Sequence, residues 1–213
     1  MNFSPQYTLY AKAVVGLLSI VNPMGAIPVF LSLCGERNPA ERRRIARRAA
    51  VAVGLILVIS AWTGEALLRF FGIGLPAFRA GGGLLILLMA IAMMHARLSP
   101  SRQNQREAEE ADSREDIAVV PLAIPLMAGP GAISMVIVDT HQAMGLGNRL
   151  VLTSAIVIVT LVVWLVLHLA EPIGARLGIT GLNIATRVMG LLLAAIGIQM
   201  MAGGLIRLFP GLG

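Results

Sequence analysis

Runs of about 20 apolar residues recur along this chain between short polar segments, and they constrain its fold more than any other feature. A helix needs roughly 20 consecutive apolar residues to cross the hydrocarbon core of a bilayer. Hydrophobic residues make up 57% of the chain, a surplus over ordinary soluble domains that lipid contact explains. We therefore predict an all-α integral membrane protein forming one membrane domain over residues 1–213.

Six runs are predicted to be transmembrane helices, at residues 9–33, 49–71, 75–94, 117–139, 150–169 and 182–206. Residues 35–48 carry six arginines and are predicted to be a polar loop, while residues 144–149 and 172–180 are predicted to be short turns. The N-terminal residues lack the basic region and cleavage site of a signal peptide, so we expect the first span to be retained.

The central segment, residues 96–116, mixes four arginines with six acids and has no apolar period. We interpret it as a solvated linker. Short cytoplasmic loops retain Lys and Arg, which places residues 35–48 and this linker inside and both termini in the periplasm. Topology thus accounts for the net charge of +6, and no nucleic-acid partner is predicted.

Two ordered series of residues recur in the two halves of the chain, residues 1–95 and 117–213. At equal internal spacing, Glu65, Phe71, Gly72 and Ile73 match Glu171, Leu177, Gly178 and Ile179, and Arg79, Gly82 and Met93 match Arg187, Gly190 and Met201. Because each half has three spans, the second half would enter the membrane from the opposite side. Inverted three-helix repeats of this kind are typical of secondary transporters.

Proline and glycine interrupt the first span of each half. Asn22-Pro23 and Gly129-Pro130 are each typical of a helix start, with a capping residue before a proline at the first helical position. Free N–H groups at such starts favour a carboxylate, and carbonyls released by proline favour a cation, so a small zwitterion would suit the paired breaks. The alternative is that these residues only permit close helix packing. The candidate solute-binding residues are Asn22, Pro23, Gly25, Ala26, Pro28, Pro125, Gly129, Pro130, Gly131 and Ala132.

Five of the charged residues inside the predicted spans or near their ends are candidates for a role in transport. Arg79 and Arg187 occupy equivalent positions and are candidates for attracting a substrate carboxylate, with extension to the membrane surface as the alternative. Asp139, Glu65 and Glu171 are candidates for proton coupling, with a plain interfacial charge as the alternative. No metal-ligand or nucleophile pattern is found within the spans, so neither an enzyme nor a cofactor is predicted.

Residues 22–31 (NPMGAIPVFL) and 121–133 (PLAIPLMAGPGAI) closely resemble signature stretches of the MarC family of bacterial inner-membrane proteins. Residues 78–82 (FRAGG) and 187–190 (RVMG) also resemble that family, and the likeness covers nearly the whole chain. The resemblance implies six spans and periplasmic termini. Some members are regarded as transporters of small neutral amino acids, and the family looks distantly related to LysE-type amino acid exporters.

These patterns predict a secondary transporter of small neutral solutes, with small neutral amino acids such as glycine or alanine foremost, in the bacterial inner membrane. A channel, an exporter of another small metabolite and a non-transporting structural membrane protein are the alternatives. The predicted partners are the lipid bilayer and a small-molecule substrate. Coupling to protons or sodium ions and assembly into a homo-oligomer are left open.

Overall fold

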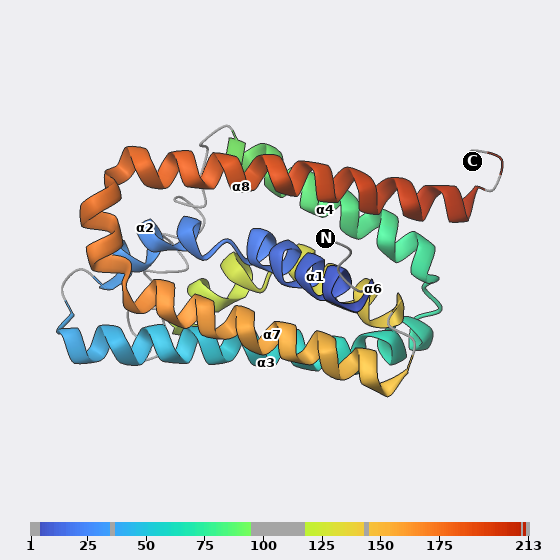
Figure 1. Cartoon of the computed structure of the whole chain (residues 1–213), viewed down its shortest axis with the longest axis horizontal. Coiled ribbons are helices and arrows are strands. Elements are labelled where there is room, and N and C mark those ends of the chain that lie inside the picture. The colour runs from blue at the N-terminus through green and yellow to red at the C-terminus, as the bar shows by residue number, and fades with distance from the viewer. Residues whose placement is uncertain (1–4, 35–36, 95–117, 143–144, 210, 212–213) are drawn as a thin grey trace.

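The computed structural model describes residues 5–34, 37–94, 118–142, 145–209 and 211, and its regular structure there is entirely helical. The predicted linker at residues 96–116 lies outside the described residues. The elements are α1 (Pro5–Val21), α2 (Pro23–Cys34), α3 (Pro39–Phe70), α4 (Leu75–Met94), η1 (Ala118–Met127, a π-helix), α6 (Pro130–Gln142), α7 (Leu146–His168) and α8 (Ala170–Leu208), shown in Figure 1.

Five helical segments in the described part of the chain are long and apolar enough to cross a membrane. They are Ala13–Cys34, Pro39–Phe70, Leu75–Met94, Leu146–His168 and Ala170–Leu208. The span predicted at residues 117–139 is not among them, because it is divided into η1 and α6, each shorter than a bilayer crossing requires. Helix length therefore confirms a multi-pass membrane protein, but not the count of six.

The predicted loop at residues 35–48 is wrong, since α3 begins at Pro39 and carries most of the arginines on its first turns. Asn38 caps this helix: its side chain accepts a hydrogen bond from the Glu41 N–H at 2.9 Å, and the Glu41 carboxylate accepts one from the Asn38 N–H. This capping box, with Pro39 at the first helical position, satisfies N–H groups that have no partner within the helix. Arginine is also a good helix former.

The turn predicted at residues 172–180 is shorter than expected, because α8 is helical from Ala170 and the chain turns at a kink at Gly178, where two helices join. Gly178 has φ 60°, and its counterpart in the first half, Gly72, has φ 66° where α3 gives way to α4. Both values lie in the left-handed region that glycine adopts without steric cost. The two glycines that match in sequence therefore also share a positive φ.

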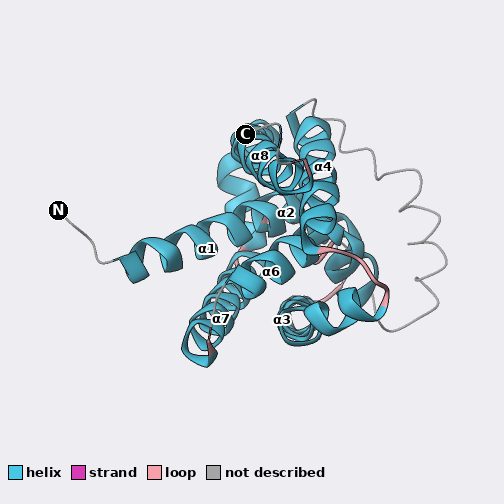
Figure 2. Cartoon of the chain, turned by 90° about the vertical axis from the view of Figure 1, so that its right-hand side faces the viewer, coloured by secondary structure: helices cyan, strands magenta, loops and turns pink. Residues whose placement is uncertain are grey.

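The helices form three layers when the molecule is viewed along its length (Figure 2). α4 and α8 pack against each other on one side, α3 and α7 pack on the other, and α2, η1 and α6 lie between them, while α1 extends outward toward the N-terminus. The middle layer and the inner end of α1 supply much of the fully buried core, including Ile27, Leu122 and Met127 of the middle layer and Leu17 and Ile20 of α1. The broken helices are thus shielded by the unbroken ones.

Small residues bring α4 and α8 close together along an antiparallel contact (Figure 1). On α8, Gly190, Gly197 and Gly204 recur every seven residues and face α4. A Cβ atom added at Gly197 would lie 2.9 Å from the Gly83 carbonyl oxygen, and one at Gly204 would lie 2.6 Å from the Pro76 carbonyl oxygen. In a membrane the hydrophobic effect does not drive helices together, so they associate through close packing of their backbones at small residues.

Replacing Gly197 by Val is expected to lower the thermal unfolding midpoint of the purified protein, because the new side chain would collide with the backbone of α4. Overpacking of this kind costs about 1–3 kcal/mol. Gly81→Val is the matched control, since nothing lies within 4 Å of a Cβ atom at Gly81. The measurement is thermal unfolding in detergent, and equal midpoints for the two variants would contradict the close contact.

Candidate functional site

The first break lies at Asn22, between α1 and α2. Asn22 has φ 44°, and among residues other than glycine in the described chain it alone has a positive φ; asparagine tolerates this conformation better than most residues. Its side-chain oxygen accepts a hydrogen bond from the Gly25 N–H at 3.2 Å. The helix start predicted at Asn22-Pro23 is therefore present, with Asn22 as its cap.

The second break lies between η1 and α6. The Ala128 N–H donates to the Ala123 carbonyl at 2.8 Å, a five-residue step that extends the wide π-helical winding of η1, which contains Pro125. α6 then begins at Pro130, and the Ile133 N–H donates to the Gly129 carbonyl at 3.1 Å. The start predicted at Gly129-Pro130 is also present, and π-helical turns are frequent at functional sites.

The structure brings the two breaks together in the interior. A Cβ atom added at Gly131, one residue into α6, would lie 3.8 Å from a methyl of Ile20, which precedes the first break by two residues. The same atom would lie 3.1 Å from Ile86 of α4 and 3.2 Å from the Met89 sulfur. The second break is therefore packed tightly against both α1 and α4.

Most of the predicted binding residues at the breaks are buried. The buried ones are Pro23, Gly25, Ala26, Gly129, Gly131 and Ala132, and Asn22 is half-buried. Pro130 is exposed, and so is Pro28, which lies inside α2 without interrupting it. Pro28 therefore does not contribute to the break.

The two predicted arginines have different environments. Arg79 is half-buried on α4, where its guanidinium packs against Gly203 of α8. Arg187 is exposed on α8. Their equivalence in the repeat therefore does not extend to their surroundings.

Ion pairs that the sequence did not predict join the long helices at both ends of the bundle. At one end, Glu65 near the end of α3 pairs with Arg149 at the start of α7, with an N···O distance of 3.0 Å, and also with Arg69. At the other end, Arg42 at the start of α3 pairs with Glu171 at the start of α8, at 2.5 Å. The sequence held one clue to these ion pairs, which is that Glu65 and Glu171 are equivalent in the repeat. In the structure each of them contacts an arginine near the start of a long helix of the other half.

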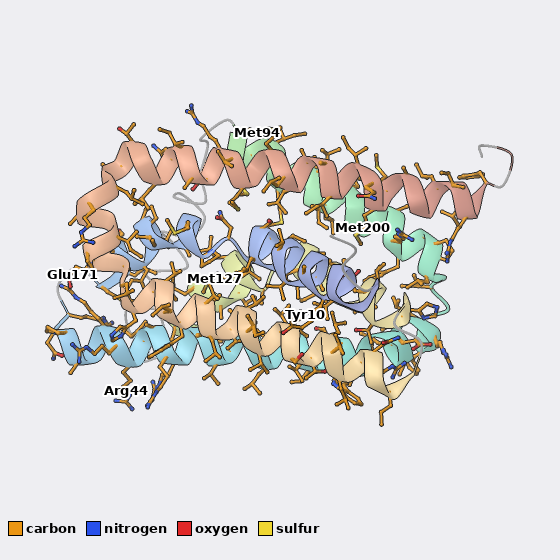
Figure 3. The ribbon with its side chains drawn as sticks, viewed as in Figure 1. Tyr10, Arg44, Met94, Met127, Glu171 and Met200 are labelled. Carbon is orange, nitrogen blue, oxygen red and sulfur yellow. The ribbon has the colours of Figure 1, made fainter. Side chains whose placement is uncertain are left out.

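A cavity of about 250 Å³ lies beside the Arg42–Glu171 pair and is also lined by Phe30 and His168. Figure 3 shows Glu171 and Arg44 at this end of the bundle. Within the residues that the structure describes, no three His, Cys, Asp or Glu side chains gather in a way that could hold a metal ion.

Residues 7–209 of the chain match the family model described as "MarC family integral membrane protein". The chain belongs to the MarC family. Relatives include the UPF0056 membrane protein YhcE of Escherichia coli (strain K12), 40% identical over 97% of this chain and 96% of the relative. A UPF0056 membrane protein of Aquifex aeolicus (strain VF5) is 38% identical over 94% of each chain.

An archaeal relative, the UPF0056 membrane protein MJ1677 of Methanocaldococcus jannaschii, is 37% identical over 94% of this chain and 96% of its own. No solved structure matches the chain significantly. The names of these relatives describe membrane proteins and give no substrate.

In this MarC family protein, Asn22→Ala is expected to be less stable than Asn22→Gly. Alanine loses the cap on α2 and also strains the positive φ, whereas glycine loses only the cap. Loss of an N-cap to alanine costs about 1 kcal/mol, against a few tenths for glycine. Thermal unfolding of both variants in detergent tests this, and an alanine variant as stable as the glycine variant would contradict the capped break.

Proposed function

We propose that this protein is a secondary transporter of small neutral solutes in the bacterial inner membrane, with small neutral amino acids such as glycine and alanine as its substrates. The observation that carries the proposal is the pair of half-helix starts, at Pro23 and Pro130, that lie side by side in the interior. Broken helices meeting near the membrane midplane form the binding sites of many secondary transporters.

We further propose six crossings arranged as two inverted repeats, with α1 and α2 forming one broken crossing and η1 and α6 the other. Equivalent helices of the two halves pack together, α3 with α7 and α4 with α8. Gly72 and Gly178 share a positive φ, and the two equivalent glutamates each pair with an arginine of the other half. An approximate two-fold axis in the membrane plane would produce these equivalences.

The chemistry of the breaks suits a small zwitterion. N–H groups at the starts of α2 and α6 and the positive ends of their dipoles favour a carboxylate. The buried residues Gly25, Ala26, Gly131 and Ala132 add little bulk and no charge. In this conformation the breaks are tightly packed, so the substrate would enter as the helices part, with the ion pairs at the two ends opening in turn.

A channel is less well supported by the same structure. The buried polar residues of the described chain are Ser19, Ser134, Thr140 and Thr186. Ser19 and Thr140 donate their hydroxyl hydrogens to carbonyls of their own helices, those of Val15 and Val136. A continuous water-filled path would need polar groups turned toward it.

The sixth crossing can be tested by labelling single cysteines introduced into a Cys34→Ala background. Arg44, Ile73 and Arg207 are exposed, at the start of α3, after α3 and near the end of α8. We expect an impermeant maleimide to label Ile73→Cys and Arg207→Cys from the periplasm, and Arg44→Cys only after the membrane is permeabilised. If η1 and α6 do not cross, positions 73 and 207 would instead be labelled from opposite sides.

Transport can be tested by uptake and counterflow of labelled glycine and alanine in proteoliposomes, with and without a proton gradient. We expect saturable flux that falls at least about tenfold in Pro23→Ala, which restores a backbone donor at the break, and in Gly131→Leu, which collides with Ile86. Pro28→Ala is the matched proline control, because Pro28 is exposed and lies inside an unbroken part of α2. A tenfold loss corresponds to about 1.4 kcal/mol.

The outcomes separate the parts of the proposal. Absence of saturable flux for both amino acids under every gradient would remove this substrate class. Flux that is equal in Pro23→Ala and the wild type would exclude the break as the site. Flux that grows in proportion to concentration without saturating would indicate a channel.

A further inference from the structure

A second cavity lies where α4, α6 and α8 meet, at the end of the bundle away from the arginine-rich start of α3. Its volume is about 140 Å³, and the polar side chains in its lining are Arg79, Asp139 and Gln199. Met200, which also lines it, is labelled in the right-hand half of Figure 3, whereas Arg44 and Glu171 are labelled on the left. The cavity has room for roughly five water molecules at ~30 Å³ each, which is more than enough for a solute such as glycine.

Arg79 brings an unsatisfied positive group to this cavity. Its Nε atom is buried and has no hydrogen-bond partner among the described residues. A Cβ atom added at Gly203 would lie 3.0 Å from both Cζ and Nη2 of Arg79, so the guanidinium lies directly against the backbone of α8. A buried donor without a partner is costly, and a bound anionic group would satisfy it.

Asp139 brings the opposite charge from α6, and the charge of Arg79 acts on its carboxyl group. The two side chains line the same cavity, yet they form no ion pair among the contacts of the described chain. Gly131, Met135 and Asp139 are spaced four apart on α6 and therefore share one face. That face leads from the second break to the cavity.

The repeat does not account for this arrangement. When Pro23 is aligned with Pro130, Asp139 corresponds to position 32 of the first half, which is Ser32. Arg187, the counterpart of Arg79, is exposed. A packing feature inherited by duplication would be expected in both halves, whereas the paired charges occur in one.

We propose that Arg79, Asp139 and Gln199 form a binding site for the charged groups of a small zwitterion, with its carboxylate on Arg79 and its ammonium group on Asp139. This site would receive the solute before it moves along α6 to the paired breaks, and in that respect the proposal rests on the transport function proposed above. Gln199 can donate to the carboxylate or accept from the ammonium group.

The test is ligand-dependent thermal stability of the purified full-length protein in detergent, with glycine, alanine, glycinamide and acetate as separate probes. We expect the two amino acids to raise the unfolding midpoint, and the two analogues, which each lack one charged group, to require at least about tenfold higher concentrations. Arg79→Gln and Asp139→Asn should each raise the half-saturating glycine concentration at least about tenfold. Arg187→Gln, at the equivalent exposed position, should leave it unchanged.

Two further variants keep the test decisive if either charge-removing variant fails to fold. Gly203→Ala retains both charges but displaces the guanidinium, and Gln199→Leu removes the amide from the rim of the cavity. We expect each to weaken glycine binding several-fold. Unchanged binding in both would overturn the proposal.

Flux measured in parallel separates this site from the transport function. Wild-type flux without a glycine-dependent shift, or with a shift that survives in Arg79→Gln and Asp139→Asn, would overturn the site and leave transport standing. A shift that depends on both residues in a protein without flux would support the site and overturn transport.

Discussion

The constraint on which the structure depends is that the backbone polar groups of a broken helix cannot face lipid. Each unsatisfied N–H or C=O in hydrocarbon costs several kcal/mol, so the segments around Asn22 and Gly129 have to be enclosed by protein. The three layers follow from this requirement, with the broken helices in the middle and the long helices outside. Large exposed apolar side chains on the outer helices, among them Leu55, Ile59, Leu161, Leu165 and Leu191, then suit contact with lipid tails.

The outer helices are held together by two different kinds of contact. α4 and α8 approach through glycines, at a distance that leaves no room for a side chain at Gly83 or Gly197. α3 and α7 also approach closely at one glycine, Gly54 against Thr160, but here the Glu65–Arg149 ion pair joins the helices at one end. Close packing through glycine does not depend on charge. An exposed ion pair at a helix end contributes little to stability, because water can solvate both partners once they separate. The α3–α7 side is therefore the one whose ends can separate at small cost.

The sequence predicted those features of the fold and site that arise from local chemistry. Asn22-Pro23 and Gly129-Pro130 start helices because a cap and a missing N–H act on neighbouring residues. The prediction of a loop at the arginine-rich start of α3 is wrong because the capping residues Asn38 and Glu41 start a helix there despite the clustered charge. The meeting of Arg79 with Asp139 could not be predicted, since it depends on how α4, α6 and α8 converge.

The separation of charged from uncharged sites follows from the cost of charge in a membrane. A formal charge is most costly at the bilayer centre and cheaper near the interface. The paired breaks offer only backbone dipoles and small side chains, whereas Arg79 and Asp139 lie near the ends of their helices, where α4 begins and α6 ends. A zwitterion has no net charge, so it can be recognised by side-chain charges near the surface and by backbone groups at depth. A simple anion or cation carries only one of the two charges that Arg79 and Asp139 would pair with, so the proposed path suits a neutral amino acid better than either ion.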